Sequence, residues 1–233
     1  YEISECLVGS EMCIRDRRTP LTSIYGACSA MLENYDALPR QTHIKLLSDV
    51  CADAQWLVRM VENLLSVTRV DTSTVRLSKN DTVLEELIDA VLVKFHKHYP
   101  DTEVHVEIPE EFVSIPMDAM LISQVLMNLL ENAVFHAKGM KNLWLRVEVK
   151  GLWAYFYVED DGCGIPEEKL PKLFTGMLGS EAPTDQSRSS MGIGLSVCSA
   201  IIKAHGGEIW ANKRAGGGTE VGFRLEMEDE NGE

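Results

Sequence analysis

The chain has 233 residues, of which 45% are hydrophobic and 25% are charged, and its formal net charge is −14. This composition supplies enough apolar material for one or two globular domains with buried cores. The acidic balance argues against nonspecific binding to nucleic acid, which requires a basic surface. A nucleotide remains compatible with an acidic chain, because Mg²⁺ and a helix N-terminus can meet its charge locally. The sequence contains no apolar run of 18 or more residues that would cross a membrane.

Residues 1–17, YEISECLVGSEMCIRDR, follow neither a helical period nor a strand alternation. They also lack the basic start and the long apolar middle of a secretory signal. The segment resembles a peptide that arises when a sequencing adapter or a cloning scar is translated in frame with a truncated gene. We therefore exclude it from fold prediction, with a native N-terminus as the alternative.

Residues 18–70 predict a helical hairpin. Apolar residues recur at helical spacing between positions 22 and 35, a break follows at 36–39, and a single apolar stripe then runs from 44 to 65. Two helices joined by a short loop form an antiparallel pair. Because one stripe stays exposed, we expect a homodimer in which four helices from two chains close one core. The alternative is a hairpin buried within a single larger domain.

Residues 75–228 predict a mixed α/β domain. Helices are expected over 84–95, 120–137 and 196–204, and strands over 104–108, 143–149, 153–158, 208–211 and 219–225. Strands paired as hairpins and interleaved with helices favour an α/β sandwich over a doubly wound parallel sheet. The predicted fold class is therefore α+β, with a two-helix antiparallel hairpin followed by an α/β sandwich.

Six cysteines are scattered without the short paired spacing of a zinc site, and the six histidines form no ligand cluster. The cysteines are Cys6, Cys13, Cys28, Cys51, Cys163 and Cys198. Free, buried thiols in a reducing cytoplasm are the expected state.

Two amides form the first candidate binding feature. Asn128 and Asn132 lie four residues apart in a Leu-rich helix, so both side chains project from one face. Asparagine is a poor helix former, and its neutral oxygen suits Mg²⁺. The alternative is a pair of amides that hydrogen-bond between helices.

Two glycine-bearing blocks follow. The first, Asp160-Asp-Gly162-Cys-Gly164-Ile165-Pro, comes directly after a predicted strand, where glycines let the backbone approach a planar base and a carboxylate can accept from its amine. Asp-Gly also simply marks turns. The second, Gly192-Ile193-Gly194-Leu195, opens a helix whose free N–H groups could hold phosphate.

Between these blocks, residues 175–191 are rich in Gly, Ser, Pro and Thr and predict a mobile lid. Arg188 precedes the glycines and could reach a terminal phosphate, although an ordinary solvated arginine is the alternative.

Together with Phe174 and the run Gly216-Gly-Gly-Thr219, these blocks follow the order of the N, G1, F, G2 and G3 boxes of histidine kinase catalytic domains. Residues 18–24, RTPLTSI, match the tail of the phosphoacceptor box that opens the dimerisation hairpin. The chain thus resembles the cytoplasmic core of a two-component sensor histidine kinase, and is most similar to the Kdp-type osmosensitive potassium-channel sensors. This resemblance implies the ATP-binding fold of the histidine kinase and gyrase superfamily.

The resemblance also implies roles for individual residues. Asn132 would coordinate Mg²⁺, Asn128 would support the metal or the reacting phosphate, and Asp160 would accept a hydrogen bond from the adenine amine. The γ-phosphoryl of ATP would pass to a hairpin histidine and then to an aspartate on the receiver domain of a response regulator. The implied ATP-binding residues are Asn128, Asn132, His136, Asp160, Gly162, Gly164, Ile165, Phe174, Arg188, Gly192, Ile193, Gly194, Leu195 and Thr219.

The phosphoacceptor box departs from the family pattern, because Arg15 stands where the family has its histidine. A guanidinium stays protonated and has no free lone pair, so we expect autophosphorylation to be lost. Asp16, which helps to activate the acceptor in the family, then has nothing to activate. Thr19 matches the position that such kinases use when they dephosphorylate their regulator.

Phe135 is a second departure, because many relatives have a phosphate-contacting lysine there. We expect weaker but not abolished triphosphate binding, with Lys138 or Lys141 as possible substitutes.

Two other classes stay open: a different ATPase of the same superfamily, such as gyrase, MutL or an anti-sigma serine kinase, and a nucleotide-binding pseudokinase. The hairpin argues against the first, and Arg15 favours the second. A sensor domain is expected upstream, which would make this chain the cytoplasmic part of a sensor anchored in the membrane only through that upstream segment.

Overall fold

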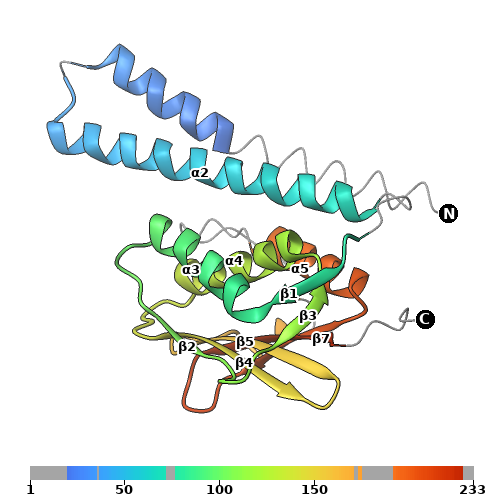
Figure 1. Cartoon of the computed structure of the whole chain (residues 1–233). Coiled ribbons are helices and arrows are strands. Elements are labelled where there is room, and N and C mark those ends of the chain that lie inside the picture. The colour runs from blue at the N-terminus through green and yellow to red at the C-terminus, as the bar shows by residue number, and fades with distance from the viewer. Residues whose placement is uncertain (1–19, 36, 72–76, 171–172, 175–190, 228–233) are drawn as a thin grey trace. The chain divides into compact units, whose positions relative to one another are not determined.

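The structure is a computed structural model that describes residues 20–35, 37–71, 77–170, 173–174 and 191–227 (Figure 1). For residues 55–56, 59–71 and 191–193 within these ranges, only the backbone is described. The chain divides into two compact units, Tyr1–Leu64 and Leu65–Glu233, and each is described by itself. None of the described helices has the length and apolar content that a membrane crossing requires.

The first unit contains two helices joined by a tight turn. Residues 20–33 are helical, and α2 (Arg40–Asp71) follows Pro39 at once. The carbonyl of Asn34 accepts from the N–H groups of Ala37 and Leu38, which closes the turn. The predicted hairpin is therefore present. Several of its large apolar side chains are exposed: Leu21, Tyr25, Leu32, Tyr35, Ile44, Leu47 and Val58.

The second unit is an α/β sandwich, as predicted. Its elements are β1 (Asn80–Val83), α3 (Leu84–His98), β2 (Val104–Glu107), β3 (Ser114–Met117), α4 (Ala119–His136), β4 (Leu143–Lys150), β5 (Trp153–Asp160), α5 (Met191–Ala204), β6 (Glu208–Lys213) and β7 (Thr219–Glu226). Five strands form a mixed sheet in the order β2-β4-β5-β7-β6, in which only the β2–β4 pair is parallel. Helices α3, α4 and α5 lie over one face of this sheet (Figure 1).

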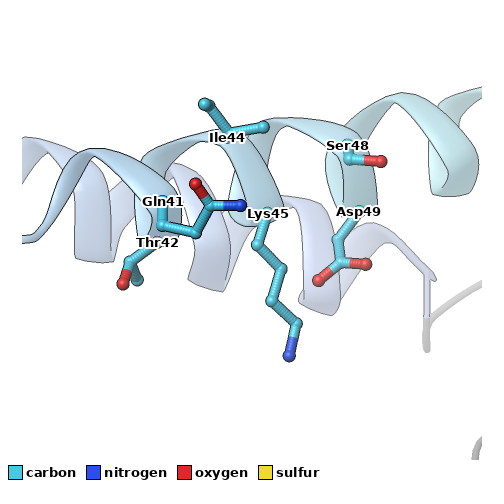
Figure 2. Close-up of a pocket in the computed structure, with 6 residues that line it drawn as sticks. All are labelled: Gln41, Thr42, Ile44, Lys45, Ser48 and Asp49. Carbon is cyan, nitrogen blue, oxygen red and sulfur yellow. The ribbon is translucent and has the colours of Figure 1, made fainter.

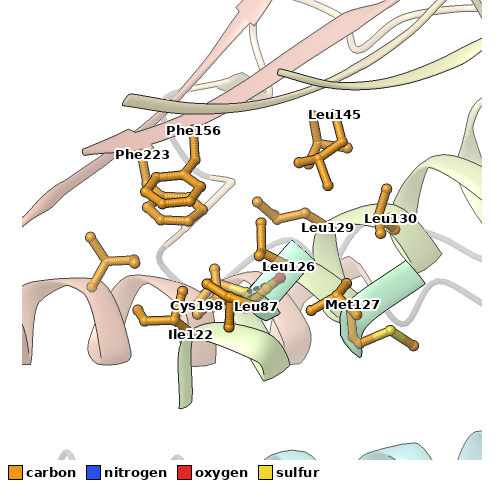
Figure 3. Packing of buried hydrophobic residues seen from close by; sticks show 14 of the residues in the cluster. Leu87, Ile122, Leu126, Met127, Leu129, Leu130, Leu145, Phe156, Cys198 and Phe223 are labelled. Carbon is orange, nitrogen blue, oxygen red and sulfur yellow. Dashed lines mark hydrogen bonds between the residues drawn. The ribbon is translucent and has the colours of Figure 1, made fainter. Parts of the chain in front are cut away.

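The core lies between the sheet and its helices because buried and half-buried residues alternate along β4 and β5. The rings of Phe156 and Phe223 stack face to face with centroids 4.6 Å apart (Figure 3). Leucines of α4, among them Leu126 and Leu130, are fully buried against this layer. The apolar period of α4 therefore fixes which of its faces is left for polar side chains.

Two short strands were not predicted. β1 and β3 pair with each other outside the main sheet, and Pro116 lies within β3, opposite Asp81. Pro116 is tolerated because each strand of a two-stranded ribbon has a free edge, where a missing N–H costs no ladder bond. Helix α5 begins at Met191 rather than at the predicted Ser196.

Candidate functional site

Three segments that are distant in the sequence meet at the end of β5. A Cβ atom built on Gly162 would lie 2.7 Å from the Cβ of Ala137, which follows α4. A Cβ built on Gly164, whose φ is 72°, would lie 3.1 Å from the carbonyl oxygen of Gly218. The turn 160–165 is therefore clamped between the end of α4 and the turn that precedes β7. The close approach to Ala137 requires a glycine at position 162, whereas at position 164 the positive φ favours glycine and the contact with Gly218 is tight.

Asp160 lies at the centre of this junction, and its side chain is buried. Its Oδ1 atom accepts the backbone N–H of Gly162 at 2.9 Å, and the backbone and hydroxyl of Thr219 also hydrogen-bond to it. Burial raises the pKa of Asp160, and the bonds from Gly162 and Thr219 oppose that rise. The result is a carboxylate held in one orientation by its own turn and by the start of β7.

The two amides of α4 have different surroundings. The side chain of Asn128 hydrogen-bonds the thiol of Cys198 on α5, which is fully buried and whose pKa is raised to about 12 by that burial. The Nδ2 atom of Asn132 is buried and has no hydrogen-bond partner among the residues that the structure describes. An unmet buried amide is costly in a finished core but suits a site that a ligand completes. The unmet group is an N–H donor, which can bond to a phosphate or another acceptor of a ligand but cannot ligate a cation. Coordination of Mg²⁺ by Asn132 would use its amide oxygen, which is a hard donor.

The end of α4 brings His136 beside the turn. Burial lowers the pKa of His136, and its carbonyl oxygen accepts from the N–H of Lys138 at 2.9 Å and from the thiol of Cys163 at 3.6 Å. The neighbouring Phe135 is 48% exposed and meets Tyr99 edge to face, with ring centroids 5.9 Å apart. An apolar ring thus occupies the position of the expected lysine.

The remaining predicted residues fall into two groups. Ile165 and Phe174 are half-buried and pack against the core, and Leu195 is buried. Gly192, Ile193 and Gly194 lie in the first turn of α5, which begins five residues before the predicted start at Ser196. Arg15, Asp16, Thr19 and Arg188 lie outside the described residues.

Asp161 was not among the predicted site residues. Its Oδ1 atom accepts the N–H groups of Lys141 at 2.7 Å and Asn142 at 2.9 Å, and its Oδ2 accepts the Asn142 side-chain amide at 2.7 Å. These three bonds lower the pKa of Asp161 to about 2, so it is ionised at neutral pH. The sequence did contain one indication of this role, because a second carboxylate stands directly after a predicted strand. At such a position, the backbone N–H groups of a neighbouring loop can reach the side chain.

A separate open depression of about 420 Å³ lies in the first unit. Its lining residues all come from one stretch of α2: Gln41, Thr42, Ile44, Lys45, Ser48 and Asp49. Figure 2 shows Lys45 and Asp49 extending to the same side of the helix. None of the predicted nucleotide-binding residues lines it, so it is not the site built around Asp160.

Comparison with known proteins agrees with this arrangement. Residues 117–229 match the family described as Histidine kinase-, DNA gyrase B-, and HSP90-like ATPase. The sensor protein KdpD of Clostridium acetobutylicum is 34% identical over 214 residues, which are 91% of this chain and 24% of that protein. The sensor protein kinase WalK of Staphylococcus saprophyticus is 27% identical over 91% of this chain and 35% of its own length. The chain thus spans about a quarter of KdpD and about a third of WalK.

Among solved structures, histidine kinase ThkA in complex with the response regulator protein TrrA covers 99% of this chain and 64% of the ThkA chain. The TM-score is 0.74 at 24% sequence identity, which supports a shared fold.

Proposed function

We propose that this chain binds ATP together with Mg²⁺ as the core of a sensor histidine kinase, because its residues 117–229 match the ATPase family of these kinases and because sensor proteins KdpD and WalK are similar to it over 91% of its length. The observation that carries this proposal is the junction at Asp160. A fixed, buried carboxylate and an amide with an unmet hydrogen bond lie on the two segments that Gly162 brings into contact.

Each residue has a definite task in this proposal. Asp160 accepts a hydrogen bond from the exocyclic amine of adenine, while Gly162 and Gly164 keep side chains away from the base. Asn132 coordinates Mg²⁺ through its amide oxygen, and Asn128, one turn earlier on α4, supports the metal or the reacting phosphate. The bound nucleotide supplies a transferable γ-phosphoryl group, and the protein contributes positioning and charge neutralisation.

We further propose that this chain does not phosphorylate itself on the usual residue, because Arg15 occupies the acceptor position. Arginine offers no lone pair at any working pH. The test is incubation with γ-labelled ATP followed by measurement of acid-labile label. We expect none on the chain as it stands, label on Arg15→His, and none on Arg15→His combined with Asn132→Ala. Acid-labile label on the unaltered chain would contradict the proposal.

The proposed partners are a response regulator receiver domain and a second copy of this chain. ThkA, whose fold is similar to that of this chain, was solved in complex with the response regulator protein TrrA, which supports a receiver domain as the partner here. The exposed apolar side chains of the hairpin, including Leu32, Ile44 and Leu47, supply the surface for a dimer. Light scattering of the chain and of Leu47→Asp would measure the dimer directly. We place the chain on the cytoplasmic side, as part of a larger sensor.

A nucleotide-binding pseudokinase is the second candidate, and Arg15 is the observation that favours it. Both candidates bind ATP. They differ in the Arg15→His variant, because a kinase core regains labelling when its acceptor is restored and a pseudokinase does not.

A further inference from the structure

Asp161 joins two walls of the proposed nucleotide site. Its carboxylate accepts three hydrogen bonds from the segment that connects α4 to β4, namely the N–H groups of Lys141 and Asn142 and the side-chain amide of Asn142. All three donor–acceptor distances are between 2.7 and 2.9 Å. Bonds to an ionised acceptor are the stronger kind.

The strand register explains why these groups meet. Leu143 pairs with Asp160 at the last position of the β4–β5 ladder. The next residues outward are Asn142 and Asp161, and there the Asp161 side chain accepts the N–H groups of Lys141 and Asn142. The carboxylate therefore extends the pairing of the two strands beyond their last paired residues.

Two further contacts fasten the same segment, residues 137–142, to the turn after β5. The N–H of Cys163 donates to the carbonyl oxygen of Lys138 at 3.0 Å. Gly162 approaches Ala137 so closely that a Cβ would not fit. Of these three contacts between the turn and residues 137–142, the one at Asp161 is made by a side chain. A substitution at Asp161 therefore removes its contact without replacing a glycine.

We infer that Asp161 is a positioning residue that holds the turn bearing Asp160 in register with the end of α4, which bears Asn132. This inference rests on the proposed function, because it assigns Asp160 to adenine and Asn132 to Mg²⁺. A ligand that contacts both residues needs a fixed separation between them, and a displacement of about 1 Å can cost on the order of 100-fold in a positioned site.

The experiment is calorimetric titration of the chain with Mg-ATP, and with ATP in the absence of Mg²⁺, at a temperature well below unfolding. Asp161→Ala removes all three bonds. Asp161→Asn keeps an oxygen that can accept the N–H groups of Lys141 and Asn142. It also places the new side-chain amide nitrogen opposite that of Asn142, so the hydrogen bond between the two side chains is lost. Asp161→Asn combined with Asn142→Asp restores the side-chain pair with the donor and acceptor exchanged, at unchanged net charge. Asp101→Ala removes an exposed acid from another loop as the matched control.

We expect Asp161→Ala to raise the Kd for Mg-ATP about ten-fold and to reduce the gain in affinity that Mg²⁺ provides. The exchanged pair should bring the Kd back to within about two-fold of the unaltered chain, and Asp101→Ala should leave it unchanged. Unchanged Mg-ATP affinity and Mg²⁺ dependence in a folded Asp161→Ala would overturn the inference while leaving the proposed function intact. Failure of the unaltered chain to bind Mg-ATP would overturn both.

Discussion

Gly218 lies directly against the backbone of Asp160: a Cβ atom at position 218 would be 1.8 Å from the Asp160 carbonyl oxygen. The φ angle of Gly218 is also positive, at 95°. The turn before β7 is therefore part of the candidate site although it contributes no functional side chain, because it limits where the Asp160 backbone can lie.

Substitution of Gly218 should affect both stability and nucleotide binding. In Gly218→Ala, the positive φ alone costs about 1–2 kcal/mol, and the overlap with Asp160 must be relieved by a shift of the site. Gly151→Ala is the control, because Gly151 also has a positive φ, of 62°, but a Cβ there meets nothing within 4 Å. We expect both variants to unfold at lower temperature and only Gly218→Ala to lose ATP affinity. Equal ATP affinities would refute this role of Gly218.

Phe135→Lys should tighten the binding of ATP. The side chain is 48% exposed, so a lysine can be accommodated, and the loss of its contact with Tyr99 costs about 0.5–1.5 kcal/mol of stability. The new ammonium group adds attraction for a triphosphate but none for adenosine. Competition binding of ATP and adenosine would measure the difference, with Phe135→Met as the uncharged control. Identical ATP affinities in the two variants would contradict the expectation.

His205 should make stability fall as pH falls below neutral. It is buried, its Nε2 accepts the N–H of Asp118 at 3.1 Å, and its Nδ1 lies 2.8 Å from the Ile201 carbonyl oxygen. Burial lowers the pKa of His205 from its ordinary value of 6.5, while the hydrogen bond with Ile201 and the charge of Asp118 oppose that shift and the charge of Lys79 assists it. As the pH falls, the unfolded chain therefore takes up a proton at this histidine before the folded chain does. The stability that the neutral His205 contributes is complete above pH 6.5 and is lost as the pH falls below that value.

The measurement is thermal unfolding at pH 8 and pH 5.5. His205→Ala should unfold at lower temperature at pH 8 and show a smaller further decrease at pH 5.5 than the unaltered chain. His98→Ala, which removes an exposed histidine, should retain the full pH dependence. An unaltered pH dependence in His205→Ala would show that other groups cause it.

Mg-ATP should protect Cys163 from alkylation. This thiol is exposed and belongs to the turn that follows Asp160, whereas Cys51 is exposed on α2 and Cys198 is buried. Peptide mass spectrometry after a short treatment with iodoacetamide would follow each thiol separately. We expect nucleotide to slow modification at Cys163 and to leave Cys51 unaffected. Equal rates at Cys163 with and without saturating nucleotide would place the ligand elsewhere.

Long, regular patterns were predicted well. The helix expected over 120–137 is α4 (Ala119–His136), and the two strands expected around Lys150-Gly151 are β4 and β5. Their apolar periods are local properties that a single segment carries. β1 and β3 were missed because neither strand has a strong period. They form only because residues as distant as Asn80 and Met117 pair in the folded chain.

The sequence by itself determined the chemistry that is available: two amides one helical turn apart, a carboxylate after a strand, and glycines where a base or a phosphate can approach. Only the tertiary structure decided how each group is used. Asn128 and Asn132 look equivalent in the sequence, yet the packing of α5 gives Asn128 a partner in Cys198, while the amide nitrogen of Asn132 stays buried without one among the described residues. Likewise, strand order and register bring Gly218 against Asp160 and Asn142 against Asp161. Contacts between such distant residues depend on which elements become neighbours, and no local pattern encodes that choice.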